Sequence, residues 1–222
     1  MAVWDDIFSG EDKEVYERAG YARKMGFGKK PGLLIVDITY PFVGEKKPVL
    51  ESVKRFPQSA GEYGWKAVEN VAKLLPIARS KKLPIFYVDR QYNRVIRKFS
   101  QDSAEAPEMG QKERGHNIVK EIAPIKGEVI IYKEGASAFF GTNLMSLLNP
   151  LGLDTLLICG GTTSGCVRST VVDAAQYSFY VGIIADCCYD RIQLSHKASL
   201  FDMNRYGDVI SLEEALEYIS AV

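Results

Sequence analysis

Short runs of apolar residues recur along the chain, separated by longer stretches that mix apolar and polar positions. The five runs are Gly32–Val36, Pro84–Val88, Glu128–Tyr132, Thr155–Cys159 and Val181–Ala185. Runs of about five residues that are rich in Val, Ile, Leu and Tyr are typical of strands covered on both faces of a parallel sheet. We therefore predict five buried strands, with a short edge strand at Asp208–Ile210.

The stretches between these runs carry helical periodicity. Helices are predicted at Tyr63–Lys81, Asn143–Leu148 and Cys166–Tyr180, and in the C-terminal SLEEALEYI segment. Asn149 and Pro150 are expected to end the second helix. Ser211 followed by Glu214 three residues later predicts a capping box at the start of the last helix.

Strands and helices alternate, which predicts an α/β fold of three layers, with helices on both faces of a mainly parallel six-stranded sheet. We predict one domain over residues 1–222, of which residues 1–30 form an N-terminal extension. The polar stretch Asn93–Gly115 has no apolar period and is expected to be a surface loop or lid.

Charge and cysteine content narrow the class of protein. The 222 residues contain 28 Lys and Arg and 28 Asp and Glu, so no net basic field favours nucleic acid or an anionic membrane. The four cysteines show neither paired zinc spacing nor a secreted disulfide framework. The start of the chain is acidic, and no apolar run reaches the roughly 18 residues of a membrane span. We expect a reduced, cytoplasmic protein with no nucleic-acid or membrane partner.

Three ionisable residues stand at the ends of predicted strands. Asp37 follows the first strand, Lys133 follows the third, and Cys166 follows the fourth after a Gly-Gly-Thr-Thr-Ser-Gly turn. Sites in parallel α/β sheets lie beyond the carboxyl ends of the strands, so the three side chains are predicted to share one rim.

These residues suit nucleophilic catalysis. A helix N-terminus and the Lys133 ammonium are expected to favour the Cys166 thiolate, while Asp37 accepts and returns a proton. Backbone N–H groups of the small-residue turn are placed to face an oxyanion. The alternatives are a capping or loop acid at Asp37, a solvated Lys133–Glu134 pair, and a plain buried cysteine at Cys166.

The same segments resemble the cysteine hydrolases of the isochorismatase-like superfamily, most closely the branch of N-carbamoylsarcosine and maleamate amidases. The resemblance rests on PGLLIVDITYPF, IIYKEGASAFFGTNL, GGTTSGCVRSTVVDAAQYSFYVGIIADCCYDR and LFDMNRYGDVIS. It implies the isochorismatase-like fold and a catalytic triad of Asp37, Lys133 and Cys166. It further implies a cis peptide bond between Gly161 and Thr162, and an oxyanion hole formed by the N–H groups of Thr162 and Cys166.

The resemblance also implies a substrate site. Arg191 matches an arginine that holds a substrate carboxylate; the alternative is a structural ion pair with Asp186 or Asp190. Thr163 is expected to offer a hydroxyl contact. Pocket walls are predicted at three aromatic residues that are otherwise ordinary core: Phe42, Tyr92 and Phe139. His196, Phe201 and Asp202 match a segment near subunit contacts and are interpreted as structural.

The function implied is hydrolysis of a linear amide or carbamoyl C–N bond in a small substrate that carries a carboxylate, with release of ammonia. No metal and no cofactor are expected, since the only two histidines lie outside the region where metal-dependent relatives bind the ion. A homotetramer or homodimer is implied.

Other functions stay open at this point. Biuret, ureidoacrylate and lactams are alternative substrates. A non-catalytic flavodoxin-like binding protein and a pseudo-enzyme with a structural Cys166 are alternatives of another class, although neither GxGxxG nor GxxxxGK[ST] occurs in the chain.

Overall fold

Six parallel strands form the centre of the computed structural model, which describes residues 2–90 and 117–222. Their order across the sheet is β3-β2-β1-β4-β5-β6. The strands are β1 Pro31–Val36, β2 Ile85–Arg90, β3 Val129–Lys133, β4 Thr155–Gly161, β5 Tyr180–Tyr189 and β6 Asp208–Ile210. Each of the five predicted apolar runs and the predicted edge strand corresponds to one of these strands, although the runs predicted from Pro84 and Glu128 begin one residue early, and the predicted fold class is confirmed.

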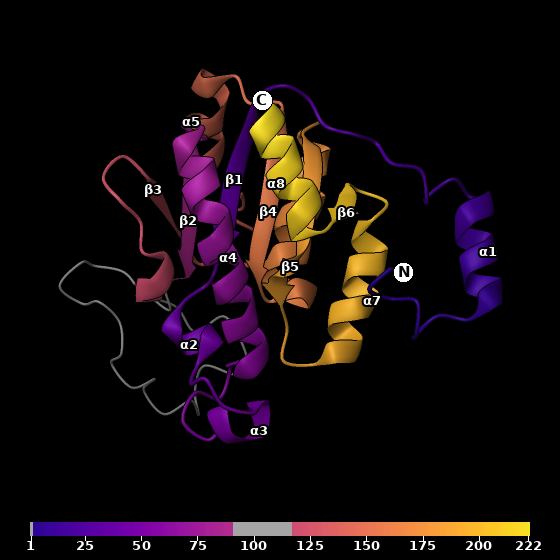
Figure 1. Ribbon diagram of the computed structural model, residues 1–222, viewed down its shortest axis with the longest axis horizontal. Helices are drawn as coiled ribbons and strands as arrows, with labels where there is room; N and C mark the ends of the chain where they lie inside the picture. Colours follow the sequence, from indigo (N-terminus) through magenta and orange to yellow (C-terminus); the bar gives the residue numbers. More distant parts are fainter. Residues whose placement is uncertain (1, 91–116) are drawn as a thin grey trace.

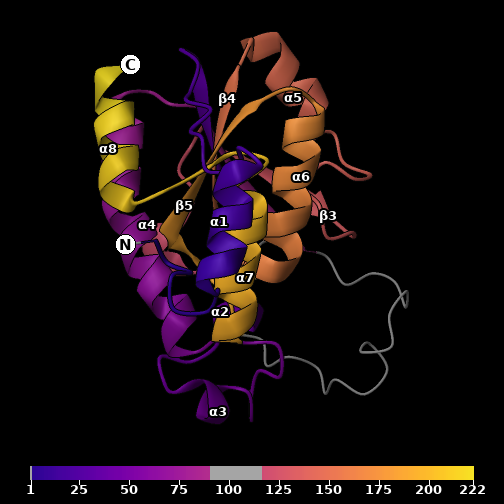
Figure 2. The ribbon, with the colours of Figure 1, turned by 90° about the vertical axis from the view of Figure 1, so that its right-hand side faces the viewer.

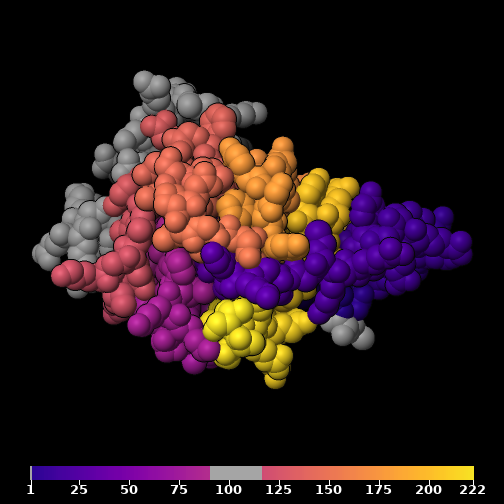
Figure 3. Space-filling view, turned by 90° about the horizontal axis from the view of Figure 1, so that it is seen from above, coloured from indigo at the N-terminus to yellow at the C-terminus, as the bar shows by residue number. Residues whose placement is uncertain are grey.

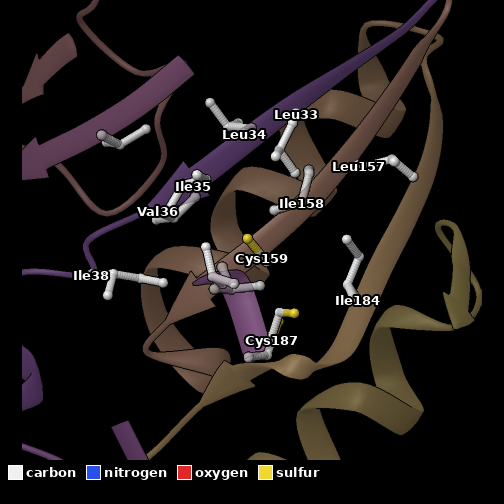
Figure 4. Packing of buried hydrophobic residues seen from close by; sticks show 14 of the residues in the cluster. Leu33, Leu34, Ile35, Val36, Ile38, Leu157, Ile158, Cys159, Ile184 and Cys187 are labelled. Atoms are coloured by element: carbon white, nitrogen blue, oxygen red, sulfur yellow. The ribbon is translucent and has the colours of Figure 1, made fainter. Parts of the chain in front are cut away.

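Burial explains why the two central strands are continuously apolar. Every residue of β1 and β4 is buried, because helices cover both faces of the sheet. Leu33 pairs with Ile85 on one side and with Leu157 on the other, which places β1 between β2 and β4. Figure 4 shows how aliphatic side chains of β1 and β4 fill this core together with Cys159 and Cys187.

Helices form the two outer layers (Figures 1 and 2). The long helix α4 and the C-terminal α8 contact each other on one face, while α5 and α6 lie on the other. The helices are α1 Gly10–Arg18, α2 Tyr40–Val43, α3 Val49–Ser52, α4 Glu62–Ser80, α5 Leu144–Leu151, α6 Arg168–Gln176, α7 Gln193–Met203 and α8 Leu212–Ala221, with a 3-10 turn η2 Lys120–Ile122 and a π-turn η3 Thr163–Val167. The predicted capping box of Ser211 and Glu214 is present.

Two predicted boundaries were wrong. Helix α5 continues through Asn149 and Pro150 to Leu151, and the left-handed conformation of Gly152 caps it. The predicted helix Cys166–Tyr180 divides into the π-turn η3, the regular α6 and the start of β5. The predicted loop or lid at Asn93–Gly115 lies outside the described residues.

The N-terminal segment, drawn in indigo, projects from the body of the molecule before the chain enters the sheet (Figures 1 and 3). Helix α1 buries no residue fully. Tyr16 of α1 and Phe8, which precedes the helix, attach this segment to α7, with ring centroids 4.3 and 4.0 Å from that of Phe201. Further along, the Asp208 carboxylate accepts hydrogen bonds from the backbone N–H groups of Met25 and Gly26. These bonds fix the segment that leads into β1.

Candidate active site

The carboxyl ends of β1, β3 and β4 bring the three predicted catalytic side chains together. Asp37 directly follows β1, Lys133 is the last residue of β3, and Cys166 lies in η3 after β4. Because β2 separates β3 from β1, Lys133 starts about two strand spacings, or roughly 10 Å, from β1. The four-carbon stem of a lysine gives its ammonium the reach to approach the end of β1.

The contacts among these three side chains are direct. The Lys133 Nζ lies 2.8 Å from Asp37 Oδ2 and donates a hydrogen bond of 3.3 Å to Cys166 Sγ. It also donates to the carbonyl of Gly135 at 3.0 Å. Lys133 and Asp37 are almost entirely buried. This geometry excludes a solvated Lys133–Glu134 pair and an exposed loop acid at Asp37.

Burial controls the protonation of the carboxylate. It raises the pKa of Asp37, and the nearby Lys133 ammonium opposes that rise. Neither carboxylate oxygen accepts a hydrogen bond of regular geometry within the part of the chain that the structure describes. Beyond its ion pair, the carboxylate therefore has lone pairs available to receive a proton.

The expectation that Cys166 favours the thiolate was wrong. Burial raises the pKa of the Cys166 thiol to about 11, and the negative charge of Asp37 adds to the rise while Lys133 opposes it. Desolvation of the anion outweighs the single ammonium, and the π-turn η3 comes before the regular helix α6. Burial therefore favours the protonated thiol, which lies next to an acceptor carboxylate.

The turn that carries Cys166 is held from several directions. Ser164 donates through its backbone N–H and its hydroxyl to Asp190 Oδ2, at 2.9 and 2.6 Å. The Thr170 hydroxyl donates to the Cys166 carbonyl at 2.7 Å. The peptide bond between Gly161 and Thr162 is cis, at the position that the resemblance implies. The oxyanion hole of Thr162 and Cys166 N–H groups stays a prediction.

Arg191 follows β5 at the same rim of the sheet. Its guanidinium donates from Nε and a terminal nitrogen to the backbone carbonyl of Gln58. Within the described residues it makes no ion pair with Asp186 or Asp190, since the Asp190 carboxylate binds Ser164 and the Arg191 backbone N–H instead. The structural alternative for Arg191 is therefore a hydrogen bond to a carbonyl and not an acidic partner.

The remaining predicted pocket residues are distributed differently. The Thr163 hydroxyl is fully buried and lies 2.8 Å from Nδ1 of His196, so it already has a protein partner. Phe42 is buried in α2. The Phe139 ring packs 5.3 Å from the ring of Tyr177, at the far end of α6 from Cys166. Tyr92 lies outside the described residues.

Two residues of the rim were missed from the sequence as parts of the site. Asp190 binds the turn that carries the cysteine, and the Tyr189 hydroxyl donates to the backbone carbonyl of Asp37 at 2.7 Å. Both lie at the end of β5, a strand that was predicted to stop at Ala185. The polar Asp186 hid the continuation, although the buried Cys187, Cys188 and Tyr189 extend the strand.

The residues that the structure describes form no metal-binding cluster at this rim. Among residues 2–90 and 117–222, no group of three or more His, Cys, Asp or Glu side chains is arranged to hold a metal ion. No helix in these same ranges is long and apolar enough to cross a membrane.

Sequence comparisons agree with this architecture. The isochorismatase domain model matches residues 31–214. Maleamate amidohydrolase from Pseudomonas putida is 32% identical over 206 residues, covering 90% of this chain and 91% of the relative. N-carbamoylsarcosine amidase from an Arthrobacter species is 30% identical over 233 residues, covering 100% of this chain and 83% of the relative. The chain belongs to the isochorismatase family of hydrolases.

Solved structures give the same fold. An isochorismatase family protein from Desulfovibrio vulgaris has a TM-score of 0.68 at 27% identity and covers 88% of this chain and 100% of its own. N-carbamoylsarcosine amidase from Thermoplasma acidophilum has a TM-score of 0.65 at 24% identity and covers 83% and 98%. The second of these likenesses supports the fold alone.

Proposed function

We propose that this protein is a cysteine-dependent amidohydrolase that cleaves a linear amide or carbamoyl C–N bond in a small, carboxylate-bearing substrate and releases ammonia. N-carbamoylsarcosine-like and maleamate-like compounds are the substrate class, as the names of the two relatives suggest. The observation that carries the proposal is the buried contact of one ammonium with both a carboxylate and a thiol.

The first half of the reaction forms a thioester. Asp37 takes the proton of the Cys166 thiol as the sulfur attacks the carbonyl carbon, so the free thiolate is never required in the resting enzyme. The N–H groups of Thr162 and Cys166 bind the tetrahedral oxyanion. The C–N bond then breaks, and the departing nitrogen takes the proton from Asp37 to leave as ammonia.

The second half regenerates the enzyme. A water molecule loses a proton to Asp37 as its oxygen attacks the thioester carbonyl. The C–S bond breaks, the acid product leaves, and the sulfur regains the proton from Asp37. Throughout, Lys133 stabilises whichever of Asp37 and Cys166 carries negative charge, because its ammonium lies beside both. The raised pKa of Asp37 suits a group that accepts and returns one proton in each half.

Arg191 is proposed to bind the substrate carboxylate. Its guanidinium is bonded to a neutral carbonyl and to no acid among the described residues, so its positive charge remains available for an anion. A guanidinium binds a carboxylate through two N–H groups at once, which orients as well as attracts it. Homo-oligomerisation also remains a prediction.

The test is ammonia release across a substrate panel. We expect turnover of N-carbamoyl amino acids or maleamate, with weaker turnover of neutral amides, biuret and lactams. Cys166→Ala should lower kcat/KM by at least about four orders of magnitude with folding intact, since the remaining groups of such a site retain only residual catalysis. Wild-type rates in Cys166→Ala would overturn the mechanism.

The proposed role of Arg191 in binding the substrate carboxylate is tested by comparing acidic with neutral substrates. Arg191→Ala should raise KM for acidic substrates about tenfold to a hundredfold, the loss of a charge-assisted hydrogen-bond pair, and should change KM for neutral amides little. Arg191→Lys should recover only part of the loss, because an ammonium is not bidentate. Equal losses on acidic and neutral substrates would remove Arg191 from carboxylate binding.

A further inference from the structure

The side chain of Tyr189 connects three strands at the catalytic rim. It belongs to β5, and β4 lies between β5 and β1. Its hydroxyl nevertheless donates to the backbone carbonyl of Asp37, at the end of β1, at 2.7 Å. The side chain therefore spans the whole width of β4.

Glycine makes this crossing possible. Gly161, the last residue of β4, pairs with Tyr189, and a Cβ at Gly161 would overlap the Tyr189 ring. The ring thus lies against the backbone immediately before Thr162, one of the two proposed oxyanion donors. One side chain touches both the residue that carries the proposed base and the segment that leads to the nucleophile.

The backbone of Asp37 is held from two sides. Its φ of 48° lies in the left-handed region, which is uncommon for residues with a side chain, although aspartate adopts it more often than most. The Asp37 N–H donates to the carbonyl of Val88 at 3.0 Å, and its carbonyl accepts from Tyr189. Strand β2 thus holds the residue on one side and Tyr189 holds it on the other.

We propose that Tyr189 is a positioning residue for the proposed hydrolase reaction, fixing the backbone conformation that directs the Asp37 carboxylate at Lys133 and Cys166. The expected effect of Tyr189 on kcat rests on the proposed function. Its expected effect on the position of the Asp37 carboxylate rests on geometry alone. Full burial raises the pKa of the Tyr189 hydroxyl well above its usual range, so it stays a hydrogen-bond donor throughout the working pH range.

The matched test compares Tyr189→Phe with Tyr218→Phe. Both substitutions delete a tyrosine hydroxyl that donates to a backbone carbonyl, but Tyr218 bonds to Gly28, before the amino end of β1. We expect Tyr189→Phe to lower kcat about tenfold, the size of one ordinary hydrogen bond, with KM within about twofold, and Tyr218→Phe to leave both constants unchanged. Equal effects in the two variants would overturn the proposal.

A second readout does not depend on the substrate. The Asp37 charge contributes to the high pKa of the Cys166 thiol. If Asp37 relaxes away from the sulfur, the pH profile of Cys166 alkylation by iodoacetamide should move to lower pH in Tyr189→Phe and stay in place in Tyr218→Phe. An unmoved profile in Tyr189→Phe overturns the positioning role.

The two readouts separate the inference from the proposed function. If the wild-type protein releases no ammonia from any substrate, the proposed function fails, while the alkylation profile still decides the role of Tyr189. Gly161→Ala is a further variant, usable if Tyr189→Phe does not fold, because it displaces the same ring without removing the hydroxyl. It should shift the profile in the same direction, and no shift would count against the proposal.

Discussion

Cys166 and Cys188 lie in two neighbouring regions of the molecule and are equally buried, with 5% and 6% of each residue exposed. Cys188 pairs with Gly160 in the interior of the sheet, whereas Cys166 lies in the turn just beyond it. Burial raises the pKa of both thiols, to about 11 for Cys166 and about 12 for Cys188. Burial therefore does not distinguish a proposed nucleophile from a structural cysteine.

The difference lies in the groups that touch the sulfur. Cys166 accepts a hydrogen bond from Lys133 and has the Asp37 carboxylate nearby, so that carboxylate can accept the proton of the thiol. The pKa of the Cys188 thiol is raised mainly by burial, lowered by a backbone hydrogen bond from Gly160 and raised further by the charge of Asp186, and no cation within the described part of the chain contributes to it. Cys159 and Cys187 are completely buried among aliphatic side chains (Figure 4). A chemical role thus depends on charged partners that other strands supply.

Removing the Lys133 ammonium should abolish the chemical difference between Cys166 and Cys188. Lys133→Met is expected to lower kcat by about a thousandfold, because the proton transfer between Cys166 and Asp37 loses its stabilising charge. It should also destabilise the fold by roughly 3–5 kcal/mol by leaving Asp37 buried without a partner, unless the carboxyl becomes protonated. Ammonia release and urea unfolding measure the two effects.

Lys81→Met is the matched control for this variant. Lys81 also donates to a backbone carbonyl, that of Ser220, but it is exposed and far from the rim. It should change activity less than twofold, as is usual for a surface substitution. Comparable activity losses in the two lysine variants would show that Lys133 acts only through stability.

Alkylation sharpens the comparison within one molecule. With thiol pKa values of about 11 and 12, the iodoacetamide rate at Cys166 should rise roughly a hundredfold from pH 7 to pH 9, since thiolate increases tenfold per unit below its pKa. Cys166 should react faster than Cys188 at equal access, because its thiolate fraction is larger at any pH below both pKa values. Peptide mapping by mass spectrometry after timed quenching gives both rates.

The contrary outcome is equally clear. A rate at Cys166 that levels off below pH 8 would mean that the free protein already holds a thiolate, as the sequence alone had suggested. It would also remove the need for Asp37 to take a proton from the thiol.

Local pattern predicted much of this architecture. Continuous apolar runs such as Gly32–Val36 marked buried strands, and the rule that sites follow the carboxyl ends of parallel strands placed Asp37, Lys133 and Cys166 on one rim. The family resemblance added their roles. The structure shows that the three side chains meet, which the periodicity of a single strand does not determine.

Other features depend on contacts between distant segments. The pKa of Cys166 depends on how completely η3 is covered, and no residue type near it in sequence encodes that burial. Tyr189 reaches across β4 to make a hydrogen bond with a residue 152 positions away. The rule that a proline ends a helix failed at Pro150, which lies inside α5 one residue before its last residue, Leu151, and nothing local in the sequence indicates that exception.

The smallest effect is expected at Cys188, the structural cysteine of this comparison. Cys188→Ala should leave kcat and KM within about twofold, because no described contact of its sulfur reaches a group of the triad, and should cost roughly 1 kcal/mol of stability for the lost buried atom. Thermal unfolding and ammonia release, measured beside Cys166→Ala, check both values. A large loss of activity without a loss of stability would make Cys188 part of the reaction. The charged side chains around Cys166 would then not be what separates a reactive cysteine from a structural one in this protein.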